Sequence, residues 1–149
     1  MISTTASLAE DQGVVLTKAS MTEVIYIALQ HGYEIKDIGE NNGDPYVVVV
    51  VDDVAFFVVG RVCNEEEKCD SLEMISFFPK HPNITLEDVN RINGDFPQVS
   101  VAIVPDQIAI SRHLILDYGV TEGNIRYNMS FFSFVLDTVE EALKAAAID

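Results

Sequence analysis

Residues 46–62 read YVVVVVDDVAFFVVGRV, and this stretch decides the fold class. Two runs rich in β-branched and aromatic residues flank Asp52-Asp53, which is the pattern of a β-hairpin with a two-residue turn. Both runs are apolar at successive positions, and strands of that kind are usually covered on both faces. Helices of the same chain can cover one face. The sequence leaves open what covers the other.

Turn signals on either side of this hairpin extend the sheet. Asn42-Gly43 is a strong turn dipeptide before it, and Pro105-Asp106 joins two further apolar runs. Pro79 ends the strand that follows the cysteines. We expect six strands, at residues 33–38, 46–51, 54–62, 71–78, 99–104 and 107–116.

Two segments carry a helix start signal of the same kind. Ser20 with Glu23 forms a capping box, and Gly32 ends the segment that follows. Thr85 with Asp88 starts a short helix that we expect to end at the next glycine, Gly94. The apolar stripes expected to face the sheet are Met21, Val24, Ile25, Ala28 and Leu29 in the first helix and Leu86, Val89 and Ile92 in the second.

The C-terminal helix shows the strongest pattern in the chain. Thr121 is an N-cap residue, and apolar residues then recur at alternating spacings of four and three. Phe131, Phe134 and Val135 widen this stripe. Two interpretations of the widening stay open: a single surface that faces the core, or an additional surface for another molecule. The regular row is Ile125, Met129, Phe132, Leu136, Val139 and Leu143.

These elements predict one α+β domain over residues 20–149, preceded by a flexible lead-in at residues 1–19. The expected order is α-β-β-β-β-α-β-β-α, with three helices packed against an antiparallel sheet. A chain of 149 residues with 48% hydrophobic residues has enough apolar material for one core.

Charge and hydropathy argue against two classes of partner. The 24 Asp and Glu residues and 9 Lys and Arg residues give a formal net charge of −15, which repels nucleic acid and anionic membranes. No apolar run approaches the ~20 residues of a membrane-spanning helix. The N-terminus lacks the features of a signal peptide, so we expect a cytoplasmic protein, or a periplasmic one if a leader was removed.

Cys63 and Cys69 raise the question of a metal or redox site. A structural zinc site needs four ligands, and only His81 and His113 follow this single cysteine pair. The spacing is not that of a C-x-x-C redox motif. Across a hairpin the two cysteines can form a disulfide in an oxidising compartment, or they can remain reduced and packed. We predict no metal site and leave both cysteine states open.

No constellation of catalytic residues emerges from the sequence. Ser111 and His113 share one strand face, but no carboxylate is placed to orient the histidine. The chain has no glycine-rich phosphate motif, and the acidic run at residues 65–67 lacks the ligand spacing of a calcium loop. We therefore predict no catalytic residues, no cofactor and no enzymatic activity.

The order of elements and four short strings resemble the YbjN family of bacterial domains. The resemblance runs from about residue 20 to about residue 143, which is most of the chain. Each string is short, and their ordered succession carries the resemblance. The strings are NGDPYV (42–47), CNEEEKCDSLEM (63–74), LEDVNRIN (86–93) and GVTEGNIRYNM (119–129).

This resemblance implies a fold similar to that of type III secretion chaperones, in which helices lie against a curved antiparallel sheet. Those chaperones are typically homodimers that hold an unfolded segment of a client. The family is described as sensory transduction regulators with no established activity. Some of its members that share the cysteine hairpin look exported, which favours the disulfide. Arg61-Val62 replaces the aromatic residue of many relatives.

We therefore expect a non-enzymatic interaction module, a homodimer that binds a protein or peptide through apolar sheet or helix surface. The alternative is a small-molecule or metal sensor with a pocket between the C-terminal helix and the sheet. Polar groups such as Arg112, His113 and Tyr118 would line that pocket. The candidate interface residues are Phe56, Val58, Phe131, Phe134 and Val135.

Overall fold

A six-stranded antiparallel sheet forms the centre of the protein, whose structure is a computed structural model that describes residues 12–148. The strand order is β2-β3-β4-β5-β7-β6. The strands are β2 (Glu34–Asn41), β3 (Asp44–Val51), β4 (Val54–Cys63), β5 (Cys69–Pro79), β6 (Ser100–Val104) and β7 (Gln107–Ile115). The helices are α1 (Met21–Gln30), α2 (Leu86–Asp95) and α3 (Glu122–Ile148). The predicted α+β class and the order of these nine elements are confirmed.

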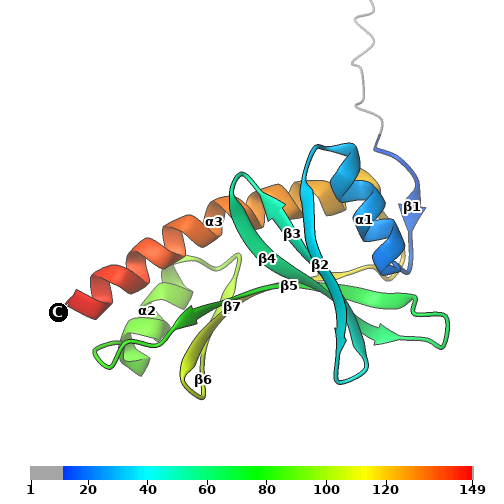
Figure 1. Cartoon of the computed structure of the whole chain (residues 1–149). Helices are drawn as coiled ribbons and strands as arrows, with labels where there is room; N and C mark the ends of the chain where they lie inside the picture. Colours follow the sequence, from blue (N-terminus) through cyan, green and yellow to red (C-terminus); the bar gives the residue numbers. More distant parts are fainter. Residues whose placement is uncertain (1–11, 149) are drawn as a thin grey trace, which may run out of the picture.

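The helices gather on one side of the sheet (Figure 1). α3 contacts β3, β4 and β5, α1 contacts β2 and β3, and α2 contacts β6. We call the side that packs against α1 and α3 the covered face. We call the other side the open face, because no described helix crosses it in Figure 1.

The hairpin turns form where the sequence predicts them. Asn42 and Gly43 have φ of 53° and 87°, and Asp52 and Asp53 have φ of 49° and 66°. A two-residue turn with positive φ at both positions matches the twist of the strands it joins and favours Gly, Asn and Asp. β6 and β7 meet at Pro105-Asp106, as predicted.

The predicted capping box at Ser20 is present, and the predicted cap at Thr85 is present as well. Ser20 Oγ accepts a hydrogen bond from the backbone N–H of Glu23, and Glu23 Oε1 accepts one from the backbone N–H of Ser20. Thr85 and Asp88 make the same pair of bonds at α2. The hydrogen bond from the Thr85 backbone, and then the one from its hydroxyl, lowers the pKa of Asp88, because both favour the charged carboxylate.

Two residues of the predicted stripes are not in the core. Leu29 and Leu86 are 57% and 71% exposed, whereas Ile27 is buried. Leu29 is rotated by about 100° from Ala28, beyond the face that meets the sheet, and Leu86 opens the first turn of α2. α2 also continues through Gly94 to Asp95, since an exposed helical glycine costs only about 1 kcal/mol.

The core lies between α3 and the covered face. The rings of Phe56 on β4 and Phe132 on α3 meet edge to face with centroids 5.0 Å apart. Each fully buried side chain of this size contributes roughly 1.5–3 kcal/mol, so this layer dominates the stability of the fold. The predicted row of α3 is confirmed, with all six residues fully buried: Ile125, Met129, Phe132, Leu136, Val139 and Leu143.

The segment before α1 is attached to the domain. β1 (Val15–Leu16) pairs with β8 (Val120–Thr121), and Ala19 exchanges two backbone hydrogen bonds with Cys69. The prediction of a flexible lead-in is therefore wrong for residues 12–19, because their partners lie far away in the sequence. Residues 1–11 lie outside the described residues. No described helix is long and apolar enough to cross a membrane.

Candidate functional site

The two apolar runs of the central hairpin serve both faces of the sheet. On β4, Phe56 and Val58 point into the core and are 2% and 0% exposed. Phe57 is only half-buried and lies on the open face, together with its cross-strand neighbour Val48. The prediction that Phe56 and Val58 form an interface is therefore wrong: their side chains point toward the helices, and α3 fills the space against them.

Three aromatic side chains cross the open face diagonally, one from each of β3, β4 and β5. The Tyr46 and Phe57 ring centroids are 5.3 Å apart, and the Phe57 and Phe77 centroids are 6.2 Å apart, both edge to face. We call Tyr46, Phe57 and Phe77 the aromatic row. A Cβ on Gly39 would lie 2.5 Å from Tyr46 Oη, so this glycine lets the tyrosine ring lie across β2. The row thus spans four strands without a gap.

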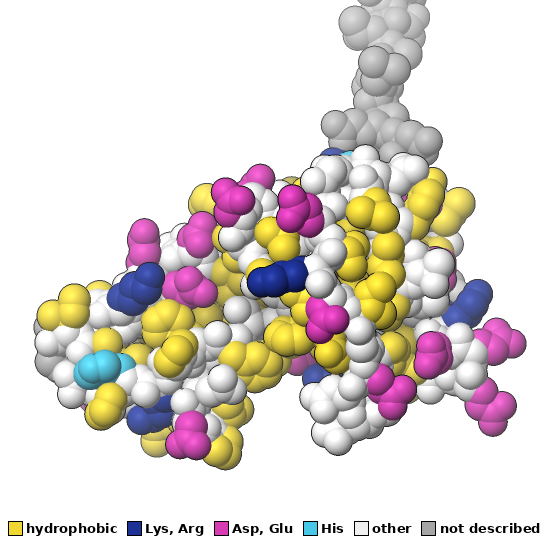
Figure 2. All heavy atoms as spheres, viewed as in Figure 1, with side chains coloured by type: hydrophobic (Ala, Val, Ile, Leu, Met, Phe, Trp, Pro, Cys, Tyr) yellow, Lys and Arg dark blue, Asp and Glu magenta, His cyan; other side chains and the backbone are white. Residues whose placement is uncertain are grey.

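The aromatic row lines a hollow of about 370 Å³. In Figure 2 the molecule is hollowed between the lobe of α2 and β6 and the arm of β2 and β3, with hydrophobic side chains around the recess. Ile75 and Val59 line the hollow between the rings. The tip of the arm of β2 and β3 supplies polar groups at one end of the hollow. The lining residues are Glu40, Asn41, Tyr46, Phe57, Val59, Arg61, Ile75 and Phe77.

Arg61, the single cation among the described residues that line this hollow, is held by two carboxylates. Arg61 Nη1 donates to Asp44 Oδ2 at 2.6 Å, and Arg61 Nε donates to Glu73 Oε2 at 3.2 Å. Burial lowers the pKa of Arg61, but the hydrogen bonds to Asp44 and Glu73 and the charges of these carboxylates together raise it by more, so the guanidinium stays charged. Glu40 takes part in none of the ion pairs found among residues 12–148. Glu40 and the two partners of Arg61 therefore set three carboxylates against one guanidinium in and beside the hollow.

The two edges of the sheet are protected against a further strand. On the β2 edge the register shifts between Ile35 and Asp37, which marks a bulge at Lys36. On the β6 edge, Asn93 of α2 accepts from the Val101 N–H and donates to the Val101 carbonyl, both at 2.8 Å. Bulges, edge charges and covering side chains all discourage strand addition. Contact with another molecule is therefore better served by the open face than by the edges.

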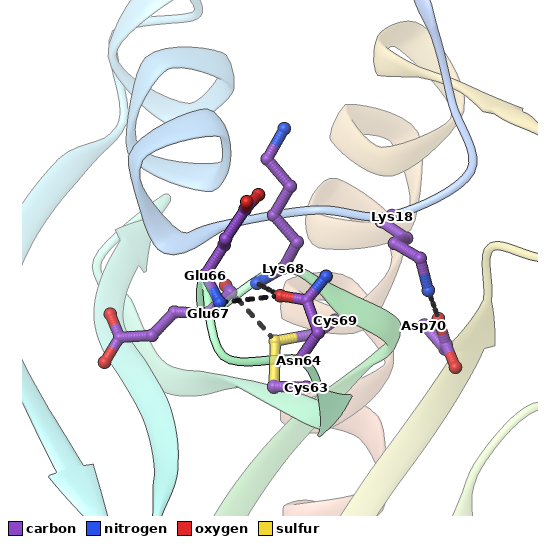
Figure 3. A network of polar contacts seen from close by, with 8 residues as sticks. All are labelled: Lys18, Cys63, Asn64, Glu66, Glu67, Lys68, Cys69 and Asp70. Atoms are coloured by element: carbon purple, nitrogen blue, oxygen red, sulfur yellow. Dashed lines mark hydrogen bonds and ion pairs between the residues drawn. A yellow bond between two sulfur atoms is a disulfide. The ribbon is translucent and has the colours of Figure 1, made fainter.

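The cysteine hairpin lies where β4 ends and β5 begins (Figure 3). Cys63 and Cys69 face each other across the ladder, as the hairpin predicts, and the structure joins them in a disulfide. Asn64 Oδ1 accepts from the backbone N–H groups of Glu66 and Lys68 and organises the loop between them. Across the start of β5, Lys18 forms an ion pair with Asp70, which ties the loop to the segment before α1.

Comparison with known proteins decides the family. The model of the YbjN family, described as "Putative bacterial sensory transduction regulator", matches residues 21–146. The chain belongs to the YbjN family. No curated protein and no solved structure gives a significant match to it. The matched range includes the aromatic row, the cysteine hairpin and nearly all of α3.

In this YbjN chain the outer side of α3 forms a second apolar surface. Phe134 is 73% exposed, and Phe131 stacks on Tyr127 with centroids 6.3 Å apart. We call Tyr127, Phe131 and Phe134 the α3 outer surface. It borders a hollow of about 610 Å³ with Asp52 and Asp137 at its rim. Val135, also predicted for an interface, is instead buried, with only 5% of its surface exposed, because it faces the sheet beside the regular row.

The residues named for a sensor pocket do not come together in the YbjN chain. Arg112 lies on the covered side, where it donates to Asn128 Oδ1 at 2.8 Å and stacks over Phe131 at 5.0 Å. His113 lies on the open side, with Nε2 2.8 Å from Ser71 Oγ, and Tyr118 is fully exposed. Within residues 12–148 no group of three or more His, Cys, Asp or Glu side chains is arranged to hold a metal ion.

Sequence reasoning missed the buried polar residues of this family member. Asn128 is 4% exposed and Ser133 is 2% exposed, in the middle of α3. Asn128 links Arg112 of β7 to Asn124, while Ser133 Oγ donates to the Val51 carbonyl at 2.8 Å. Both polar residues lie three or four residues along the helix from members of its apolar row, so helical spacing puts them on the same side of α3. This spacing was the only signal that could have shown them to be buried.

Proposed function

We propose that this YbjN-family chain is a non-enzymatic interaction module that holds a segment of a protein partner against its open face. The observation that carries the proposal is the aromatic row, which crosses a sheet face that no described helix covers. Contiguous apolar patches of this kind mark interaction sites in soluble proteins. The family description, a regulator of sensory transduction, is compatible with a protein that acts through contacts.

The manner of holding that we propose is chaperone-like. A curved antiparallel sheet presents an apolar hollow to the partner, and helices support the sheet from behind. This extends the likeness to type III secretion chaperones that the sequence strings suggest. Because both sheet edges are protected, the partner would insert side chains into the hollow and would not add a strand. Phe77, 43% exposed, is the most accessible ring of the row.

The test is affinity capture from the native bacterial cell with the wild-type chain and a Phe57→Arg variant, followed by mass spectrometry. We expect a partner that the wild type retains and Phe57→Arg loses. The matched control is Leu86→Arg, which places the same charge at an exposed leucine on α2, away from the hollow. A set of captured proteins that is identical for all three chains would refute the proposal.

The proposal includes self-association, through the α3 outer surface. Its support is the exposure of Phe134 and Tyr127, 73% and 64%, on a helix whose opposite side is fully buried. Size-exclusion chromatography with light scattering tests this. We expect a dimer for the wild type and a monomer for Phe134→Glu, with Leu86→Glu as the control that stays dimeric. A wild-type monomer at micromolar concentration would refute this part alone.

A further inference from the structure

We infer that the segment held on the open face is cationic as well as apolar: lysine or arginine side chains flank the apolar residues that enter the hollow. This inference rests on the proposed function and adds the chemistry of the partner. It comes from the charged groups around the aromatic row, among which carboxylates outnumber the one guanidinium.

Arg61 cannot serve as an anion receptor for the partner. Its guanidinium is already bound by Asp44 at 2.6 Å and by Glu73 at 3.2 Å, on two different N–H groups. A carboxylate or phosphate of a ligand would have to displace one of these partners and leave it uncompensated. Among the described residues that line the hollow, Arg61 is the only cation, and it is neutralised from within the chain.

The remaining charge in and around the hollow is negative. Glu40 lines the hollow, is exposed, and takes part in no ion pair among the described residues. With Asp44 and Glu73, three carboxylates oppose one guanidinium, which leaves two negative charges beside the aromatic row. A lysine or arginine beside the apolar residues of a bound segment would meet these groups at short range.

A second copy of the chain is a poor occupant of the open face. An isologous contact through the open face would place the uncompensated carboxylates beside the two aromatic rows against each other. A basic segment has the opposite balance, and the field of the whole molecule would also steer it to this surface. Local and global charge therefore favour the same class of partner.

The experiment uses three short fluorescein-labelled peptides with one shared apolar core, alternating phenylalanine and leucine with serine. Pairs of lysine, serine or glutamate flank the core. Binding to the full chain is measured by fluorescence anisotropy at low and at physiological ionic strength. We expect the lysine peptide to bind most tightly, by about two- to fivefold for each exposed ion pair gained, and the advantage to shrink with salt.

A matched pair of charge variants separates a local effect from diffuse attraction. Glu40→Gln should weaken the lysine peptide by about two- to fivefold and leave the serine peptide unchanged. Glu141→Gln removes another exposed carboxylate, from α3 on the other side of the sheet, and should change the binding of neither peptide. Equal weakening by both variants would overturn the inference, because the attraction would then be diffuse.

The other outcomes distinguish this inference from the proposed function. If the lysine and serine peptides bind equally and Phe57→Ala abolishes both, the cationic inference fails while the proposed function stands. If the glutamate peptide binds best, the inference is likewise wrong. If none of the three peptides binds and Phe57→Arg converts a dimer to a monomer, a second copy occupies the open face. In that case both the cationic inference and the proposed function fail.

Discussion

Phe56 and Phe57 are neighbours on one strand, and their surroundings differ completely. Phe56 packs edge to face on Phe132 of α3 at 5.0 Å and is 2% exposed. Phe57 packs edge to face on Tyr46 at 5.3 Å, yet no described helix lies above it. The same residue type thus makes the same contact on both faces. What separates a core residue from a surface residue here is the helix on one side.

Under the proposed function, stability and recognition are divided between the two faces. On the covered face, apolar contacts are completed within the chain, so their loss should destabilise the fold. On the open face the contacts are complete only between neighbouring strands, and we propose that the outer side of each ring contacts another molecule. Four tests of this division follow, in order of decreasing effect on stability.

The adjacent phenylalanines provide the most direct test. Phe56→Ala should lower the free energy of unfolding by about 3–5 kcal/mol, because it opens a cavity in a packed core. Phe57→Ala should cost about 1 kcal/mol, since its ring is already half in water. Urea unfolding followed by circular dichroism measures both. Equal losses would mean that the two faces are not divided as described.

The disulfide should support the fold without shaping the open face. Reduction, or a Cys63→Ser/Cys69→Ser double variant, should lower the free energy of unfolding by about 2 kcal/mol, the low end for a short loop. Binding of the apolar peptides by the folded protein should not change. The measurements are thermal unfolding with and without reductant and a free-thiol count. Loss of peptide binding on reduction would link the hairpin to the surface.

A substitution at Gly60 tests the packing on the covered face, near the end of β4. A Cβ there would lie 2.4 Å from Cys69 Sγ, so Gly60→Ala should cost about 1–2 kcal/mol through overpacking. Gly94→Ala in α2, where a Cβ meets nothing within 4 Å, should instead stabilise by about 0.5–1 kcal/mol. In the Cys69→Ser background the cost at Gly60 should shrink. An unchanged cost would assign the strain to something other than the sulfur.

Gly39 provides the corresponding test on the open face. The Cβ of Gly39→Ala would displace the hydroxyl end of Tyr46, a flexible side chain, so stability should change by less than about 0.5 kcal/mol. Binding of the lysine peptide should weaken, because the aromatic row loses its first ring. In a Tyr46→Ala background the same change should have no further effect on binding. An additional loss there would show that Gly39 contacts the peptide itself.

The local signals of the sequence were sufficient for most of the architecture. The capping boxes at Ser20 and Thr85, the turn at Asn42-Gly43 and the apolar row of α3 depend on residues close together in the chain. Each has a physical cause that operates within one helical turn or one hairpin. The family resemblance, from about residue 20 onward, agrees with the family match over residues 21–146.

The candidate site was harder to predict. An unbroken run of valines and phenylalanines shows no alternation, so it cannot reveal which residues face the helices, and the interface prediction for Phe56 and Val58 was wrong. Asn93 and Ser133 were missed because their partners are backbone groups of other elements. Arg61 showed no sign of its two carboxylates, which lie on β3 and β5.

Two features follow from the order of the residues alone: the hairpin at residues 46–62 is rich in apolar residues on both sides, and one long helix carries a continuous apolar row. Which side of the sheet that helix covers became clear only from the folded arrangement of the elements. The reason is that strand residues alternate with a period of two, and a run without polar positions leaves both sides equally apolar. The docking of α3, through contacts from residue 125 onward to strands far earlier in the chain, removes that ambiguity.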